Sequence, residues 1–253
     1  MSASTLTQWS VLGARSLRLG RRNLEALIMS VALPMLLMVV FVYLFGGAIQ
    51  TGTEYVTYVV PGVMLLCVSF GSAMTAVSVA TDVSAGIVDR FRSLDVGGAA
   101  LLSGHVAASL ARNVVSSALV LAVAFAIGFR PHADAGQWLA AAGILLLTIA
   151  AVSWLSAALG LLAGSPEAAS GYTFVITFLP YASSAFVPIG TMPSWLRGFA
   201  GNQPVTPITE SLRGLLLDQP VGSAPWRAAA WCAAIAIVAV AAAALLFRHK
   251  TRA

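Results

Sequence analysis

Six long stretches of almost uninterrupted apolar residues alternate with shorter polar segments along the chain. They lie near residues 26–46, 57–80, 107–129, 138–163, 170–190 and 228–247. A helix needs roughly 20 apolar residues to cross the hydrocarbon core of a bilayer, so each stretch predicts a transmembrane helix. The third stretch alone contains a charged residue, Arg112, which lies close to one end of it. We therefore expect this side chain to reach the lipid head groups.

This pattern predicts an all-α fold, a polytopic membrane protein with six transmembrane helices in a single domain over residues 1–253. The first stretch is longer than the h-region of about 7–15 residues in a signal peptide, so we expect it to be retained. Before it, residues 4–22 combine Trp9 and several leucines with four arginines. This mixture predicts an amphipathic interfacial helix within a cytoplasmic segment, residues 1–25, with a disordered basic leader as the alternative.

The segment between the last two stretches, residues 191–226, predicts two short amphipathic helices that are joined at residues 201–204. Neither is long enough to span a bilayer, so we expect a re-entrant or interfacial hairpin on the outer side, with an ordinary exposed loop as the alternative. Glu210 is expected to pair with Arg213 one helical turn further on. The residues that mark this outer hairpin are Pro193, Trp195, Pro204, Glu210 and Arg213.

Composition supports a membrane location. Hydrophobic residues make up 59% of the chain and charged residues 9%, whereas an ordinary soluble domain has about 25% charged residues. Basic residues in the N-terminal segment, the loop 81–106 and the C-terminal tail would lie on one side of the membrane. The positive-inside rule makes that side the cytoplasm, with both termini there. The basic residues share no soluble face, which argues against nucleic acid as a partner.

Groups that would support chemistry by this chain alone are missing from the sequence. The apolar stretches contain no His, Asp or Glu that could activate a nucleophile or couple transport to protons, and no metal-binding motif occurs. Cys67 and Cys232 are expected to be buried and free. The one lysine, Lys250, follows His249, so the chain has no P-loop. We therefore expect no catalytic residue, no metal and no cofactor on this chain, and energy for active transport must come from another polypeptide.

Aromatic residues occur at the expected outer ends of the stretches. Tyr55, Tyr58, Trp138 and Trp226 are predicted to form an aromatic belt at the membrane interface.

A short polar segment after the second stretch is a candidate docking site for such a polypeptide. If residues 86–94 are helical, Ile87, Phe91 and Leu94 share one face, and Asp89 and Arg92 lie on the other. An amphipathic helix with an aromatic anchor and charged rim is typical of helix-in-groove recognition. A solvated connector is the alternative. The site residues that we assign here are Gly86, Ile87, Asp89, Arg90, Phe91, Arg92 and Leu94.

Two sequences resemble those of ABC type-2 transporter permeases, and in particular the daunorubicin-resistance permease group of drug and lipid exporters. They are GIVDRFRSLDVGGAALLSGHVAASLARN, residues 86–113, and SSAFVPIGTMPSWLRGFAGNQPVTPITESLRGLL, residues 183–216. The six-span plan and the N-terminal amphipathic helix agree with that family. The resemblance thus extends over nearly the whole chain.

The resemblance implies a homodimer of permeases in the cytoplasmic membrane, each served by a cytoplasmic P-loop ATPase that binds ATP and Mg²⁺. Residues 84–95 would be the coupling helix on that ATPase, and the outer hairpin would cap the exit. The substrate would be a hydrophobic or amphiphilic drug, antibiotic or lipid that moves outward. A non-transporting scaffold or sensor that is coupled to an ATPase is the alternative function. A membrane-embedded enzyme is disfavoured by the missing acid–base groups.

Overall fold

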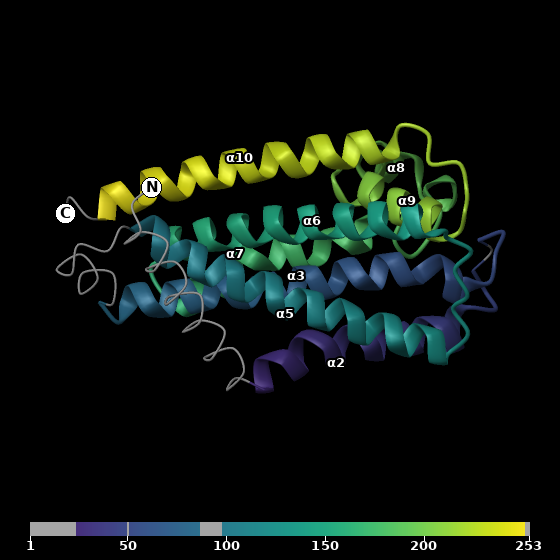
Figure 1. Ribbon diagram of the computed structural model, residues 1–253, viewed down its shortest axis with the longest axis horizontal. Helices are drawn as coiled ribbons and strands as arrows, with labels where there is room; N and C mark the ends of the chain where they lie inside the picture. The colour runs from purple at the N-terminus through teal and green to yellow at the C-terminus, as the bar shows by residue number, and fades with distance from the viewer. Residues whose placement is uncertain (1–23, 50, 87–97, 251–253) are drawn as a thin grey trace.

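The computed structural model describes residues 24–49, 51–86 and 98–250 of this 253-residue chain. These residues form helices that are joined by turns and short loops (Figure 1). The predicted interfacial helix at residues 4–22 lies outside the described residues. So does the predicted coupling helix, apart from Gly86 and the residues before it. Both stay predictions.

Four of the helices are long and apolar enough to cross a membrane. They are α3 (Tyr55–Ser84), α5 (Gly98–Ala126), α6 (Ala135–Leu162) and α10 (Ala224–Lys250). They confirm helices at the second, third, fourth and sixth apolar stretches. The first stretch forms α2 (Leu24–Val40), which contains Pro34 and continues as the π-helical turn η1 (Phe41–Phe45). Its apolar part, Val31–Phe45, is shorter than the other four.

The prediction of one continuous helix over residues 170–190 is wrong. Here α7 (Pro166–Phe178) has 13 residues and is followed by the 3₁₀ turn η2 (Leu179–Ala182). Pro180 has no backbone N–H to continue the α-helical hydrogen bonds, so the helix tightens and ends at this position. Ser183 then has an extended backbone. Six spans therefore stay a prediction, and a helix of this length would cross only part of the hydrocarbon core.

The outer segment folds into short pieces, as expected. After the turn η3 (Ile189–Thr191) come α8 (Ser194–Asn202) and α9 (Val205–Leu216), with the break at Gln203 and Pro204. Two short helices that meet within residues 201–204 confirm this part of the sequence prediction. Neither could span a bilayer by itself.

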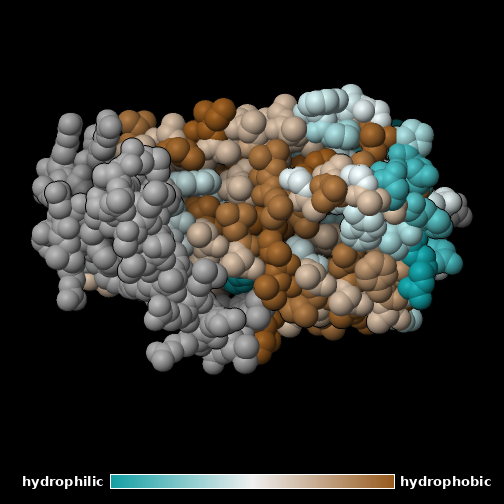
Figure 2. Space-filling model, in the orientation of Figure 1, coloured by the Kyte–Doolittle hydropathy of each residue, from teal (hydrophilic) through white to brown (hydrophobic). Residues whose placement is uncertain are grey.

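The helix α3 occupies the centre of the bundle and packs against α2, α5, α6 and α7. Figure 1 shows α2 and α10 along opposite edges, with α8 and α9 at one end. This end, which also contains the start of α10, is called the hairpin end. The opposite end, where α3 stops and α5 begins, is called the loop end. In Figure 2 a hydrophobic surface crosses the middle of the bundle, and hydrophilic residues gather at the hairpin end.

Capping residues start two of the helices. The Asp134 side chain accepts a hydrogen bond from the backbone N–H of Gln137, and the Gln137 side chain accepts one from the backbone N–H of Asp134, so α6 begins with a capping box. Ser165 caps α7 in a similar way, and Pro166 follows at the first helical position. These local signals determine where the two helices begin between the loops.

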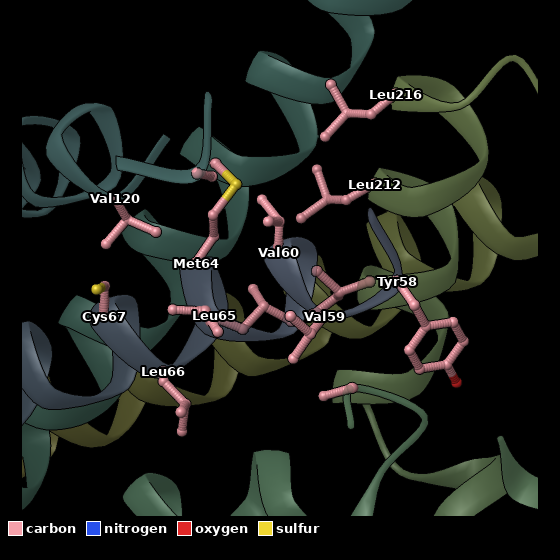
Figure 3. Close-up of a cluster of buried hydrophobic side chains, with 14 of the residues drawn as sticks. Tyr58, Val59, Val60, Met64, Leu65, Leu66, Cys67, Val120, Leu212 and Leu216 are labelled. Atoms are coloured by element: carbon pink, nitrogen blue, oxygen red, sulfur yellow. The ribbon is translucent and has the colours of Figure 1, made fainter. Parts of the chain in front are cut away.

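The largest apolar cluster joins α3 to the outer helices. Figure 3 shows Leu212 and Leu216 of α9 directed toward Val60 of α3, and all three are fully or almost fully buried. At the other half of α3 the backbone of α6 comes very close, because a Cβ atom on Gly160 would lie only 2.4 Å from the carbonyl oxygen of Ala76. Packing on α3 therefore holds both ends of the bundle together.

Candidate functional site

The outer helices are attached to α3 by buried hydroxyl groups. Tyr55 donates a hydrogen bond to the carbonyl of Phe186 at 3.0 Å, and Tyr58 donates one to the carbonyl of Ser184 at 2.9 Å. Both tyrosines are buried. The prediction that they belong to an aromatic belt is therefore wrong: they point inward, because the turns at residues 183–186 offer carbonyl groups that a helix would already have used.

Arg213 completes this attachment from α9. Its Nη2 donates to the carbonyl of Ser184 at 2.8 Å and its Nε to the carbonyl of Tyr58 at 3.2 Å. The guanidinium also lies over the Tyr58 ring, 3.6 Å from the ring centre. Burial lowers the pKa of Arg213, and the nearby Tyr58 and Glu210 act in the opposite direction. Arg213 thus holds α3, α9 and the turn at Ser184 together at one point.

The predicted pairing of Glu210 with Arg213 is wrong. Glu210 instead lies 3.5 Å from Arg227 at the start of α10, in a pair whose side chains are both partly exposed. The reason is tertiary, because Arg213 donates its hydrogen bonds to the carbonyls of Tyr58 and Ser184. Glu210 therefore pairs with Arg227 of the neighbouring helix α10. These three charged residues border an open polar recess of about 360 Å³ at the hairpin end.

The remaining hairpin residues lie at or near the starts of the two short helices. Pro193 is the N-cap residue of α8, one position before the first helical residue. Pro204 directly precedes α9. Trp195 is 79% exposed, as is Trp226 to a similar extent at 80%. Large exposed aromatic side chains at this end suit contact with lipid head groups.

An ionisable residue lies in the middle of the bundle, contrary to the sequence analysis. Arg112 is the central residue of α5, because that helix begins at Gly98, nine residues before the predicted span. Its Nη2 donates to the carbonyl of Gly71 at 2.7 Å and to the Thr75 hydroxyl at 2.8 Å. The side chain therefore binds α3.

Asn113, the next residue, extends this polar layer toward α6. It is fully buried and donates to the carbonyl of Ser109 at 2.9 Å, while the hydroxyl of Ser109 lies 2.8 Å from that of Ser153. The side chain of Asn113 requires a glycine opposite it, since a Cβ atom on Gly71 would lie 2.2 Å from its Oδ1. The buried Oδ1 of Asn113 and Oγ of Ser156 have no hydrogen-bond partner.

A further polar pair lies nearer the loop end. His105 Nε2 of α5 is 3.0 Å from the carboxylate of Asp82 on α3, and both side chains are mostly buried. Four residues after Asp82 and just beyond the end of α3, Gly86 has a φ of +69°. The pair thus links the two helices that lead into and out of the predicted coupling segment.

The interior of the bundle also contains a small apolar cavity of about 80 Å³. It is bordered by α3, α6, α7, α9 and α10, and its lining includes Thr148 and Cys232. Sites for drug-sized ligands have volumes of about 300–1,000 Å³, so this cavity could take only a small apolar group.

The described residues offer few side chains that could bind a metal ion or act as a nucleophile. No group of three or more His, Cys, Asp or Glu side chains gathers there in a way that could hold a metal ion. Cys67 and Cys232 are free and buried, as predicted.

The layer around Arg112 is the feature that sequence reasoning missed. The sequence signal that could have located this layer lies in residues 99–107. These residues extend α5 toward the loop end, so Arg112 becomes the central residue of the helix.

Comparisons with known proteins match most of the chain. The family model described as ABC-2 type transporter matches residues 7–217. The daunorubicin resistance ABC transporter permease protein DrrB1 of Streptomyces coeruleorubidus is 35% identical over 191 residues, which are 74% of this chain and 66% of that protein, just under two thirds. The probable doxorubicin resistance ABC transporter permease protein DrrC of Mycobacterium tuberculosis is 26% identical over 235 residues, which are 91% of this chain and 84% of that protein.

Proposed function

Because this chain belongs to the ABC-2 type transporter family, whose model matches residues 7–217, we propose that it is the membrane subunit of an ATP-driven exporter. The family match over most of the chain is the observation that carries this proposal. Four helices that are long and apolar enough to cross a bilayer support it. The relatives that are named permease proteins support it further.

A separate cytoplasmic ATPase supplies the energy in this proposal. The sequence contains no P-loop, and residues 86–94, if helical, would combine an apolar stripe that includes Phe91 with charged residues on the rim. Such a helix fits a groove on a partner protein. Ser84 and Gly98, the nearest helix ends on either side of this segment, both lie at the loop end. ATP and Mg²⁺ are bound by the partner, and two copies of the permease form the translocation unit.

The loop end faces the cytoplasm and the hairpin end faces outward in this proposal. The arginines before α2, between α3 and α5, and after α10 favour that orientation. The substrate is a hydrophobic or amphiphilic small molecule, since the relatives are named for daunorubicin and doxorubicin resistance. The cavity of about 80 Å³ inside the bundle is too small for such a ligand. We therefore place the path between two subunits or along the face of one.

The proposal is tested by purifying the chain from its native membrane in a mild detergent and identifying the proteins that accompany it by mass spectrometry. A P-loop ATPase in roughly equal amount is the expected result. ATP hydrolysis by the reconstituted pair should then rise when the substrate is added. An ATPase that co-purifies but never responds to any amphiphile would favour a scaffold or sensor instead. Absence of an ATPase would overturn the exporter proposal.

A further inference from the structure

The cavity of about 80 Å³ inside the bundle lies half-way along the central helices. Ser69 and Thr148, which line it, are next to the midpoints of the spans Tyr55–Ser84 and Ala135–Leu162. A helix that crosses a bilayer places its midpoint near the bilayer midplane, so the cavity is expected at that level. The edges of the hydrocarbon core are then about 15 Å away on either side.

The chemistry of the lining favours an apolar occupant. Apart from Ser69, Thr148 and Cys232, all of the lining residues are apolar. The Thr148 hydroxyl donates to the carbonyl of Ile144 at 2.8 Å and lies 3.5 Å from the Cys232 sulfur, so it already has partners. A buried water makes about three hydrogen bonds to polar groups, whereas apolar cavities stay dry and bind apolar molecules. Hydrocarbon therefore suits this cavity better than water does.

The cavity is closed toward the hairpin end and meets the surface at its side. Val205 and Ile208 of α9 border it at the hairpin end (Figure 1). Ile176 of α7 and Ile235 of α10 border it as well, and both are only half-buried. Because α7 and α10 both pack on α6, the opening lies over α6 between these two helices. An occupant must enter from the surrounding lipid.

An apolar stripe leads from this opening toward the loop end. On α6, Val152, Leu155, Leu159 and Leu162 are spaced three and four residues apart, so they share one face of the helix. Val152 and Leu155 line the cavity, Leu159 is half-buried, and Leu162 is 54% exposed. The stripe is about 15 Å long, which is about half the thickness of the hydrocarbon core. It therefore has the length of a lipid chain in one leaflet.

We propose that the cavity binds the end of an acyl chain from a membrane phospholipid whose head group lies at the loop end. An apolar cavity of about 150 Å³ holds a benzene-sized molecule, so this one holds about three carbon atoms. The rest of the chain lies along Leu155, Leu159 and Leu162. The chains of one leaflet end near the midplane, which is the level of Ser69 and Thr148. The inference goes beyond the proposed export function and requires only that the protein spans a membrane.

The test uses the full chain in a mild detergent and two photoreactive phosphatidylcholines. They are identical except for a diazirine, which is at the end of one acyl chain or next to its carbonyl group. Mass spectrometry locates the labelled residues. The chain-end probe is expected to label residues 148–155 and Cys232, and this labelling should saturate because it fills one site. The carbonyl-side probe is expected to label near Leu162.

Exposed residues of the same helix give the comparison within the wild-type chain. Leu146 and Leu147 are 45% and 38% exposed and do not line the cavity. Labelling there should rise in proportion to the amount of the probe, because an open surface has no fixed number of lipid positions. If the lining residues follow the same proportional rise, or if both probes label them equally, the inference is overturned.

Variants that fill the cavity should remove the site. Ala151 lines it and is 1% exposed. Ala151→Leu is expected to lower the affinity of the chain-end probe by at least about ten-fold, since it occupies the space of several buried carbon atoms. Ala142→Leu, at an exposed position of α6, is the matched control and should change nothing. If Ala151→Leu does not fold, Val152→Phe at the half-buried edge of the cavity is the second variant, with the same expected loss.

The labels also distinguish the other possible occupants. A carbonyl-side label near Val205 would show that the lipid comes from the leaflet at the hairpin end, and it would overturn the proposed direction. No saturable labelling at any ratio of lipid to detergent would mean that the cavity accepts any hydrocarbon tail, and it would overturn the assignment to phospholipid. Neither outcome involves the ATPase, so the exporter proposal and this inference can fail separately.

Discussion

Arg213 lies over the ring of Tyr58, 3.6 Å from its centre, and donates a hydrogen bond to the carbonyl of the same residue. One arginine from the outer segment thus holds the start of the central helix through both its ring and its backbone. The same guanidinium bonds Ser184, whose carbonyl also accepts from the Tyr58 hydroxyl.

Removing this arginine should loosen the outer helices. We expect Arg213→Gln to lower the free energy of unfolding by about 2–4 kcal/mol, because two hydrogen bonds to a charged donor and a cation–π contact are lost. The measurement is thermal unfolding in detergent, followed by tryptophan fluorescence. Arg227→Gln is the matched control and should cost less than about 1 kcal/mol, since its ion pair with Glu210 is partly exposed. Equal losses in both variants would contradict the assigned role of Arg213.

The ring and the hydroxyl of Tyr58 should contribute separately. Tyr58→Phe keeps the ring under Arg213 and removes one buried donor, for an expected loss of about 1 kcal/mol. Tyr58→Leu removes both and should cost more. A double-mutant cycle with Arg213→Gln measures the coupling. If the Tyr58→Leu effect is the same with and without Arg213, the two residues do not stabilise the fold together.

Close packing of α6 on α3 should depend on Gly160. A Cβ atom there would lie 2.4 Å from the carbonyl oxygen of Ala76, so Gly160→Val must separate the two helices. We expect a loss of about 1–3 kcal/mol, measured by thermal unfolding. Gly143, in the same helix, has nothing within 4 Å of its Cβ position. Gly143→Val should therefore have little effect, and a large loss there would argue that valine itself disfavours α6.

The coupling segment is tested by the double variant Arg90→Glu with Phe91→Ala. This change reverses one charge on the rim and removes the aromatic anchor, so the amount of ATPase that co-purifies should fall strongly. The permease itself should elute as a folded protein in size-exclusion chromatography. Arg130→Gln, at the other end of the bundle, is the control. Full retention of the ATPase by the double variant would refute docking at residues 86–94.

The side of the membrane that the outer helices face can be measured directly. Trp195 is 79% exposed, so a cysteine in its place should react with a membrane-impermeant maleimide in intact cells. The two native cysteines are buried and should give little background. Reaction that requires access from the cytoplasmic side would reverse the proposed orientation.

Several features could be predicted from the sequence because they depend only on residues that are close together along the chain. Uninterrupted apolar stretches predicted the four long helices α3, α5, α6 and α10. The proline and glycine between residues 201 and 204 predicted the break between α8 and α9. The predicted helix at residues 170–190 failed because hydropathy measures how apolar a stretch is, whereas Pro180 controls where the helical hydrogen bonds stop.

The partners of the polar side chains were decided only by the tertiary structure. Glu210 and Arg213 are one turn apart on a helix, and local spacing predicted that they would pair. Each found a better partner on another element, Arg227 for Glu210 and the carbonyls of Tyr58 and Ser184 for Arg213. Arg112 likewise bonds to another helix. It donates to Gly71 and Thr75 of α3, which precede it by about 40 residues in the chain.

The sequence by itself therefore determined that this is a membrane protein, where its four long helices lie and which family it belongs to, because hydrophobicity and motifs are properties of continuous stretches. The tertiary structure decided that a guanidinium lies at the middle of the bundle and that the outer helices are attached through Tyr58. A polar group in an apolar surrounding bonds to the nearest unsatisfied donor or acceptor. Which group is nearest depends on how the helices pack, and spacing along the chain does not contain that information.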